Sequence, residues 1–225
     1  MSLTENLRRV PVLPSIVRNG RDWRTRMTDR RLNIRTELDR DVVKPAFSQF
    51  NDHREYESMD YPCIRTFLKA LRVGPEDTVY DIGCGKGRIV CVAARLGVRK
   101  CVGVDICEEL AEQARQNART LRAPKSPIEI RAADAAAEDY SDGTVFCLFN
   151  PFGEQTLRQV LQRIHRSLDA SPRHIRIGYA SPNHGDVLRH ERWLHQYGEL
   201  RFLTHRYCID LWENLARSDS SVYFG

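Results

Sequence analysis

From Thr78 onward, the spacing of apolar positions switches between two periods, and the two periods indicate strands and helices in turn. Short and almost continuous apolar runs predict buried strands, because both faces of such a strand are covered. Longer segments with apolar residues three and four positions apart predict amphipathic helices. The expected strands cover residues 78–83, 100–106, 128–134, 144–150, 174–180, 199–211 and 220–224. The expected helices cover residues 87–97, 107–121, 154–168 and 184–197, after an earlier helix that begins near Pro62.

This alternation predicts an α/β fold with a doubly wound, mostly parallel sheet and helices on both of its faces. The 225 residues suffice for one such domain with a short extension. We assign residues 61–225 to the domain. Residues 1–60 are polar and rich in arginine, with three prolines as breakers, and we expect them to form a basic N-terminal extension and cap.

The stretch VYDIGCGKGRIV at residues 79–90 places three glycines, Gly83, Gly85 and Gly87, two positions apart at the end of the first strand. Without Cβ atoms, such a loop turns sharply and approaches a ligand closely. A phosphate-binding P-loop requires four residues between its glycines, followed by Lys and Ser or Thr, and this spacing excludes it. The dinucleotide fingerprint G-x-G-x-x-G also fails, because its third glycine falls on Arg88.

The spacing G-x-G-x-G, with Asp81 two residues ahead of it, resembles motif I of the class I S-adenosylmethionine (SAM) dependent methyltransferases. The resemblance implies SAM as cofactor, methyl transfer as the reaction and a seven-stranded sheet whose last strand is antiparallel. A sulfonium cation with an amino-acid tail requires a nearby acid and open backbone carbonyls, and Asp81 is placed to supply the acid.

Two more acids end strands in the order that this resemblance implies. Asp105 lies 20 residues after Gly85, where a carboxylate accepts hydrogen bonds from both ribose hydroxyls. The cap of the following helix is a compatible second role for it. Asp134 ends the third strand, where an acid accepts from the adenine amino group, or serves as a turn residue. The candidate cofactor contacts are completed by Cys84, Ile106, Ala135, Asn150 and Tyr61.

The fourth strand ends in Asn150-Pro151-Phe152, which resembles motif IV of the amino-group methyltransferases, although one proline replaces the usual two. The Asn150 side-chain oxygen and a backbone carbonyl accept the N–H groups of an amine and aim its lone pair at the methyl group. Proline has no N–H to compete and fixes φ. We predict that these three residues are catalytic, and the alternative is ordinary turn chemistry after a strand. The missing proline argues against methylation of nucleic-acid bases.

Residues 8–35 hold nine arginines against two acids, whereas the net charge of the whole chain is only +5. This segment is either an arm that binds RNA or DNA through its arginines, or a solvated extension or oligomer contact, and we favour the second interpretation. Its one aromatic residue, Trp23, does not make the interleaved aromatic pattern of a stacking platform. Lys86 and Arg88 are expected to point to solvent or to cap neighbouring elements.

Seven scattered cysteines without a C-x-x-C pair indicate free thiols and a reducing cytoplasmic location, with neither a disulfide framework nor a zinc site. Seven histidines form no H-E-x-x-H motif, so we expect no metal. No apolar run reaches the length of a membrane span.

The leading hypothesis is therefore a SAM-dependent methyltransferase that acts on nitrogen in a protein, a nucleic acid or a small molecule. One alternative is an inactive SAM-fold module that binds nucleic acid through the basic arm. The other is an NAD-dependent oxidoreductase, for which the sequence shows no second catalytic set. The acceptor and the oligomeric state do not follow from the sequence.

Overall fold

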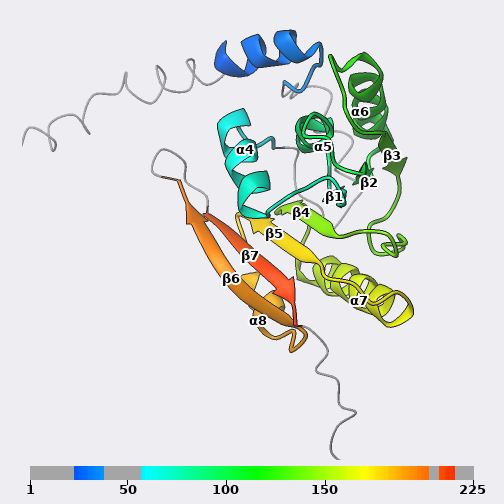
Figure 1. Cartoon of the computed structure of the whole chain (residues 1–225), viewed down its shortest axis with the longest axis vertical. Helices are drawn as coiled ribbons and strands as arrows, with labels where there is room; N and C mark the ends of the chain where they lie inside the picture. The colour runs from blue at the N-terminus through cyan, green and yellow to red at the C-terminus, as the bar shows by residue number, and fades with distance from the viewer. Residues whose placement is uncertain (1–22, 38–56, 203–207, 216–225) are drawn as a thin grey trace, which may run out of the picture.

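The computed structural model describes residues 23–37, 57–202 and 208–215 (Figure 1). Before the sheet come an N-terminal helix (residues 23–32) and α4 (Tyr61–Ala70). The strands are β1 (Thr78–Ile82), β2 (Lys100–Asp105), β3 (Ile128–Ala132), β4 (Val145–Phe149), β5 (Arg176–Ala180), β6 (Leu194–Arg201) and β7 (Cys208–Asn214). The remaining helices are α5 (Arg88–Ala94), α6 (Glu108–Thr120), α7 (Glu154–Ala170) and α8 (Gly185–Arg189). None of the described helices is long and apolar enough to cross a bilayer.

The seven strands form one sheet in the order β3-β2-β1-β4-β5-β7-β6. The first five pair in parallel, and β7 runs antiparallel to both β5 and β6. The expectation of a mostly parallel seven-stranded sheet is confirmed. The chain order reverses at the β1–β4 boundary, and ligands of such sheets bind outside the carboxyl ends of the strands at that switch point.

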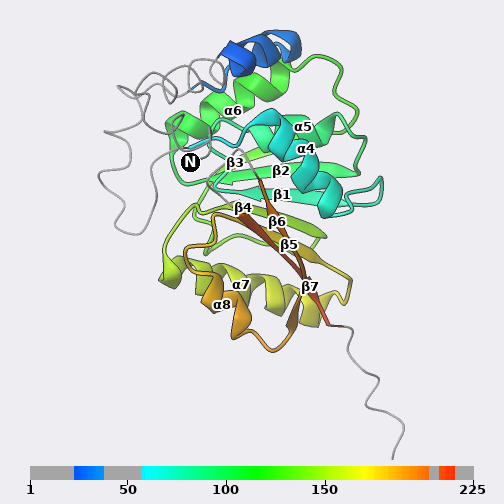
Figure 2. The same ribbon diagram turned by 90° about the vertical axis from the view of Figure 1, so that its left-hand side faces the viewer.

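The helices cover the two faces of the sheet unequally. Figure 2 shows the N-terminal helix, α4, α5 and α6 on one face, and α7 with α8 on the other. Each face has its own apolar core, and the fully buried strand β1 contributes side chains alternately to both, with Val79 in one cluster and Tyr80 in the other. This two-sided burial is the reason that the central strands read as continuous apolar runs.

The C-terminal third departs from the pattern expected from the sequence. The helix predicted over 184–197 ends at Arg189, and Leu194 already belongs to β6. The strand predicted over 199–211 is two strands, because β6 ends at Arg201 and β7 begins at Cys208. Antiparallel pairing of β6 with β7 along their length overrides the helical spacing of the local sequence. The strand predicted over 220–224 lies outside the described residues.

Residues 23–37 of the basic segment are folded onto the domain. Leu32 and Ile34 are 4% and 5% exposed and belong to the same apolar core as α4 and α5. The backbone N–H of Arg122, just after α6, donates to the Leu32 carbonyl over 2.8 Å. The expectation of a cap describes these residues, and the expectation of a solvated extension is wrong for them. The rest of the segment lies outside the described residues.

A buried polar network ties this cap to the start of α5. The Arg88 guanidinium donates to the Thr36 hydroxyl over 2.7 Å, to the Thr36 carbonyl over 3.0 Å and to the Met59 carbonyl over 2.9 Å. Its carbon lies 5.0 Å from the centre of the Tyr61 ring. The Asp29 carboxylate accepts from the Thr36 N–H over 2.7 Å, from the Thr36 hydroxyl and from the Tyr61 hydroxyl. Arg88, expected to point to solvent or to cap neighbouring elements, is 4% exposed and holds the N-terminal cap in place.

Asp29→Ala should destabilise the fold strongly, because it leaves the buried Thr36 and Tyr61 donors without their acceptor. Each unmatched buried group costs about 1–3 kcal/mol, so we expect a loss of about 3 kcal/mol in the free energy of unfolding. Urea unfolding measures it, with the exposed Glu37→Ala as the matched control. Equal stability of the two variants would contradict the role of the network.

Candidate active site at the strand carboxyl ends

The loop between β1 and α5 requires its three glycines for separate reasons. Gly83, Gly85 and Gly87 have φ values of 75°, 53° and 76°, which side chains rarely adopt. A Cβ on Gly83 would lie 2.3 Å from Cβ of Pro151, and one on Gly87 would lie 3.2 Å from Cβ of Ala114. The loop therefore packs directly against Pro151, the second residue after the fourth strand, and Gly83 is exposed.

Asp105 fastens this loop to the end of β2. Its Oδ2 accepts a hydrogen bond from the Gly85 N–H over 2.7 Å, and its Oδ1 accepts from the Cys107 N–H over 3.0 Å. The Asp105 side chain thus fixes both the turn that leads into α6 and the conformation of the glycine loop. A carboxylate has about four acceptor positions, so these two bonds leave capacity for ribose hydroxyls.

Asp81 is a second carboxyl beneath the loop, and it is only 2% exposed. Burial raises the pKa of Asp81 well above its ordinary value, the nearby Asp105 carboxylate adds to this rise, and a hydrogen bond from the Val90 backbone opposes it. A buried carboxyl of this kind is costly to ionise without a cation beside it. The site therefore favours a positively charged ligand.

The predicted adenine and nucleoside contacts differ in their exposure to solvent. Asp134 is exposed, and its Oδ1 accepts from the Ala136 N–H over 2.9 Å, as the turn interpretation predicts. Ala135 is buried and Ile106 is half-buried. Cys84 is buried beneath the loop, where burial and then Asp105 raise the pKa of its thiol well above the ordinary value. It is therefore a packing residue and not a nucleophile.

Asn150 stands at the end of β4 in a strained backbone conformation, with φ of 43°. Non-glycine residues in this region are uncommon and concentrate at functional sites. The Tyr179 hydroxyl, from β5, donates to Oδ1 of Asn150 over 3.2 Å and orients the amide. Phe152 is 2% exposed, so it forms a wall of the core and not a free stacking surface.

The sequence interpretation missed Tyr179 and Asp210, which face each other across β5 and β7. Asp210 is 4% exposed, and its Oδ2 has no hydrogen-bond partner among the described residues. The Arg189 guanidinium approaches Oδ2 only to 4.0 Å. Burial raises the pKa of Asp210, Arg189 opposes the rise and Glu199 adds to it. An acid inside the apolar run CIDLW is the signal that marks this residue in the sequence.

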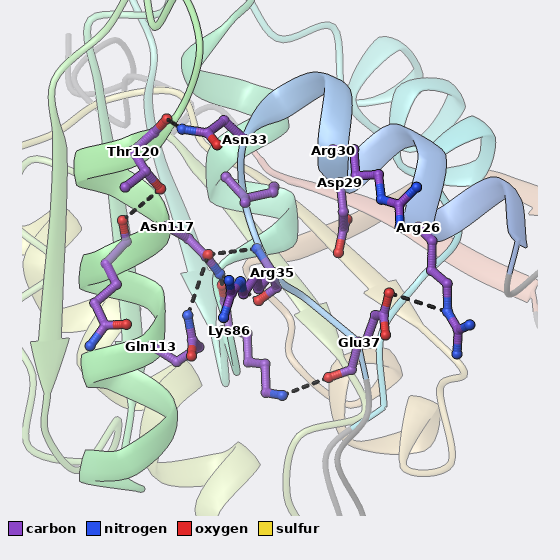
Figure 3. Close-up of a pocket in the computed structure, with 12 residues that line it drawn as sticks. Arg26, Asp29, Arg30, Asn33, Arg35, Glu37, Lys86, Gln113, Asn117 and Thr120 are labelled. Carbon is purple, nitrogen blue, oxygen red and sulfur yellow. Dashed lines mark hydrogen bonds and ion pairs between the residues drawn. The ribbon is translucent and has the colours of Figure 1, made fainter.

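Tyr61 and Lys86 lie with the N-terminal cap. The Tyr61 hydroxyl is committed to Asp29, so we leave Tyr61 out of the cofactor site. The Lys86 ammonium donates to the Glu37 carbonyl over 2.6 Å. Lys86 also lines a polar cleft of about 1090 Å³ between the N-terminal helix and α6 (Figure 3). Neither Asp105 nor Asn150 lines that cleft, which reaches the glycine loop at Lys86.

Comparisons with known proteins agree with this geometry. The methyltransferase domain family matches residues 79–171. A protein-lysine N-methyltransferase from Saccharolobus islandicus is 33% identical over 102 residues, which are 43% of this chain and 60% of that protein. A ribosomal protein L11 methyltransferase from Clostridium botulinum is 32% identical over 92 residues, 35% of this chain and 29% of that protein. The chain thus spans less than two thirds of the length of either relative.

A solved structure shares the fold. The RNA methyltransferase from Salinibacter ruber, determined with S-adenosylhomocysteine, superposes with a TM-score of 0.53 at 23% identity and covers 70% of this chain and 94% of its own. Together, the sheet order, the family match over residues 79–171 and the glycine loop support a class I, SAM-dependent methyltransferase.

Asp81→Asn should stabilise the ligand-free protein at neutral and higher pH. The pKa of Asp81 is higher in the folded state than in the unfolded state. The parent protein therefore loses stability as the pH rises from the ordinary pKa of an aspartate toward the folded-state pKa. The amide side chain of the variant carries no titratable proton, so the variant does not lose stability in this way. Thermal unfolding at pH 4, 6 and 8 measures the difference, which should widen with pH. A control Glu76→Gln, exposed beside Arg99, should show no such widening. A parent that is more stable than Asp81→Asn at pH 8 would contradict the assignment.

Proposed function

We propose that this protein transfers a methyl group from SAM to a nitrogen atom, and that the acceptor is an amine of a protein side chain. The observation that carries the proposal is the convergence of three strand ends. Asp105 from β2 holds the glycine loop through Gly85, and Pro151 after β4 packs on Gly83 of the same loop. Asn150 therefore stands beside the loop expected to hold the cofactor.

The residues present fit SAM. Positive φ angles and the exposed Gly83 give a ligand access to bare backbone, and Asp81 gains a partner when a cation binds near it. Asp105 would hold the ribose hydroxyls, and Asp134 would accept from the adenine amino group. The sulfonium supplies an already activated methyl group, so the protein has to position the acceptor and hold its protons.

The acceptor side of the site is built for an amine. Asn150 Oδ1 receives the Tyr179 hydroxyl with one lone pair and retains another for an N–H of the incoming amine. Asp210 lies beside Tyr179 on the same face, because directly paired residues of antiparallel strands are neighbours. Its raised pKa suits a carboxylate that takes a proton from an ammonium group.

The relatives support a protein acceptor. The protein-lysine and ribosomal-protein methyltransferases both act on proteins by their names, and the first is matched over 60% of its length. A lysine ammonium must lose a proton before it attacks, which is the step that Asp210 serves. A nucleic-acid base amine carries no charge and has no need of such a group.

Two alternatives have less support. An NAD-dependent enzyme would place a glycine at the position of Arg88, which instead is buried in contact with Thr36 and Met59. A catalytically inactive module has no reason to keep Asn150 in a strained conformation aimed by Tyr179. We further propose a reducing compartment such as the cytoplasm, since all seven cysteines are free and six of them are buried.

Methyl transfer from isotopically labelled SAM to a cell extract tests the function. We expect label in protein that survives nuclease and is released by protease. Asn150→Ala should lower kcat by roughly 10²-fold or more, since alignment is its main contribution, and should change SAM affinity little. Asn150→Gly removes the side chain and the backbone strain together, so an equal loss there assigns the effect to the amide.

A folded Asn150→Ala enzyme with parental turnover would place catalysis elsewhere. Label that nuclease alone releases would replace the protein acceptor with a nucleic acid. If calorimetry detects no SAM binding and the labelling assay detects no turnover, the methyltransferase proposal itself is wrong.

Asp210→Asn should change the pH profile of turnover more than its maximum. The parent rate should rise with pH as Asp210 ionises through its raised pKa. The variant should be slow at neutral pH and recover toward the ordinary lysine pKa of about 10.4, where the acceptor is neutral without help. Initial rates on a lysine peptide from pH 6 to 10 measure this, with Glu76→Gln as control. Parallel profiles for parent and variant would exclude Asp210 as the proton acceptor.

A further inference from the structure

A second cavity, of about 300 Å³, opens on the face of the domain that carries α4, α5 and α6. Its lining holds four arginines, a hydroxyl and one apolar side chain: Arg31, Arg65, Arg95, Arg122, Thr28 and Leu32. The arginines come from four separate segments, which are the N-terminal helix, α4, the residue that caps α5 and the turn after α6. Folding therefore assembles this basic pocket from distant parts of the chain.

No acid balances the charge of this basic pocket within the part of the chain that the structure describes. None of its four arginines makes an ion pair with a described residue, whereas Arg72, Arg99 and Arg176 each pair with Glu or Asp. Four like charges around one small cavity repel one another. The fold holds these arginines together in spite of the repulsion. For example, the Arg122 N–H donates a hydrogen bond to the Leu32 carbonyl, and both residues line the cavity.

The larger cleft on the other side of the N-terminal helix provides a contrast (Figure 3). It also contains arginines, but Arg26 lies 3.3 Å from the Glu37 carboxylate, and the buried Asp29 carboxylate adds a second negative charge. These two acids compensate part of the positive charge of its lining. The lining of the basic pocket contains no acid among the described residues, so this pocket is the better candidate for binding an anion.

The four guanidinium groups of the basic pocket favour phosphate as its ligand. Guanidinium groups present planar forks of donors that match phosphate oxygens in pairs. The N-terminal helix carries Trp23 two turns and Met27 one turn ahead of Arg31, and the two residues are 62% and 40% exposed. Residues four apart lie on one stripe of a helix. An exposed aromatic side chain next to a phosphate site is the arrangement with which proteins bind unpaired nucleotides.

We propose that the basic pocket binds a backbone phosphate of a single-stranded nucleic acid, with a neighbouring base stacked on Trp23. The pocket is distinct from the methyl-transfer site. Helices α5 and α6 start at the carboxyl ends of β1 and β2 and run antiparallel to these strands. Arg95 and Arg122 follow the ends of the two helices, so they lie near the amino ends of the strands, away from the glycine loop. The nucleic acid is therefore a partner that anchors the protein and not the group that is methylated.

Fluorescence anisotropy with labelled 12-nucleotide RNA and DNA strands of uridine or thymidine tests the proposal on the full chain. The double variant Arg95→Gln/Arg122→Gln should bind at least tenfold more weakly. Each lost phosphate contact should lower the slope of log affinity against log salt by about 0.7. Arg166→Gln, an exposed arginine of α7 on the other face of the sheet, is the matched control and should bind like the parent. Trp23→Ala should weaken binding roughly 5- to 100-fold, the loss of one stacked base.

Thermal unfolding separates this result from misfolding. Removing repelling charges should leave the melting temperature of the double variant equal to or above that of the parent, and inorganic phosphate should raise the parent's melting temperature more than the variant's. Binding of either strand supports the proposal, and the ratio of the two affinities tells whether a ribose 2′-hydroxyl is read. Absence of binding by the parent, an equal loss in Arg166→Gln, or equal affinity for a 12-residue polyglutamate would overturn it. None of these outcomes depends on methyltransferase activity, which the double variant should retain.

Discussion

The carboxylate of Asp105 is the constraint on which the site depends. By accepting from the Gly85 and Cys107 N–H groups, it joins the end of β2 to the loop that leaves β1 and sets the start of α6. The loop must then adopt positive φ angles, which only glycine does without strain, and its first glycine meets Pro151. One buried acid thus sets the mutual positions of three strand ends, and Asp81 beneath it gives the same place its preference for cations.

The N-terminal cap and this loop are mechanically linked. Arg88 follows the last glycine of the loop directly, and its guanidinium is bound by Thr36 and Met59, while Asp29 completes the network. A displacement of the cap therefore pulls on the first turn of α5. Such coupling makes the order of residues 29–36 a determinant of loop shape, although none of them lies at the strand carboxyl ends.

Local sequence was enough for the features that depend on short-range chemistry. The five parallel strands can be read from the sequence as apolar runs. The spacing of Gly83, Gly85 and Gly87 identifies the loop, because glycine adopts positive φ angles without strain. The β6–β7 hairpin was misread as part helix, since its pairing is invisible in either strand alone. Arg88 and Asp210 were missed or misplaced for the same reason, because a charged residue is expected in water until a distant partner segment buries it.

The position of β7 has a consequence during synthesis. The ribosome makes β7 after β6, but β7 lies between β5 and β6 in the sheet. The edge of β5 therefore stays unpaired until synthesis reaches Cys208, 28 residues after Ala180. At about 5–20 residues per second, translation needs roughly 1–6 s for that stretch. For that time the nascent sheet presents unpaired N–H and C=O groups that other chains can join. The C-terminal hairpin therefore protects the edge of β5 against association on the ribosome.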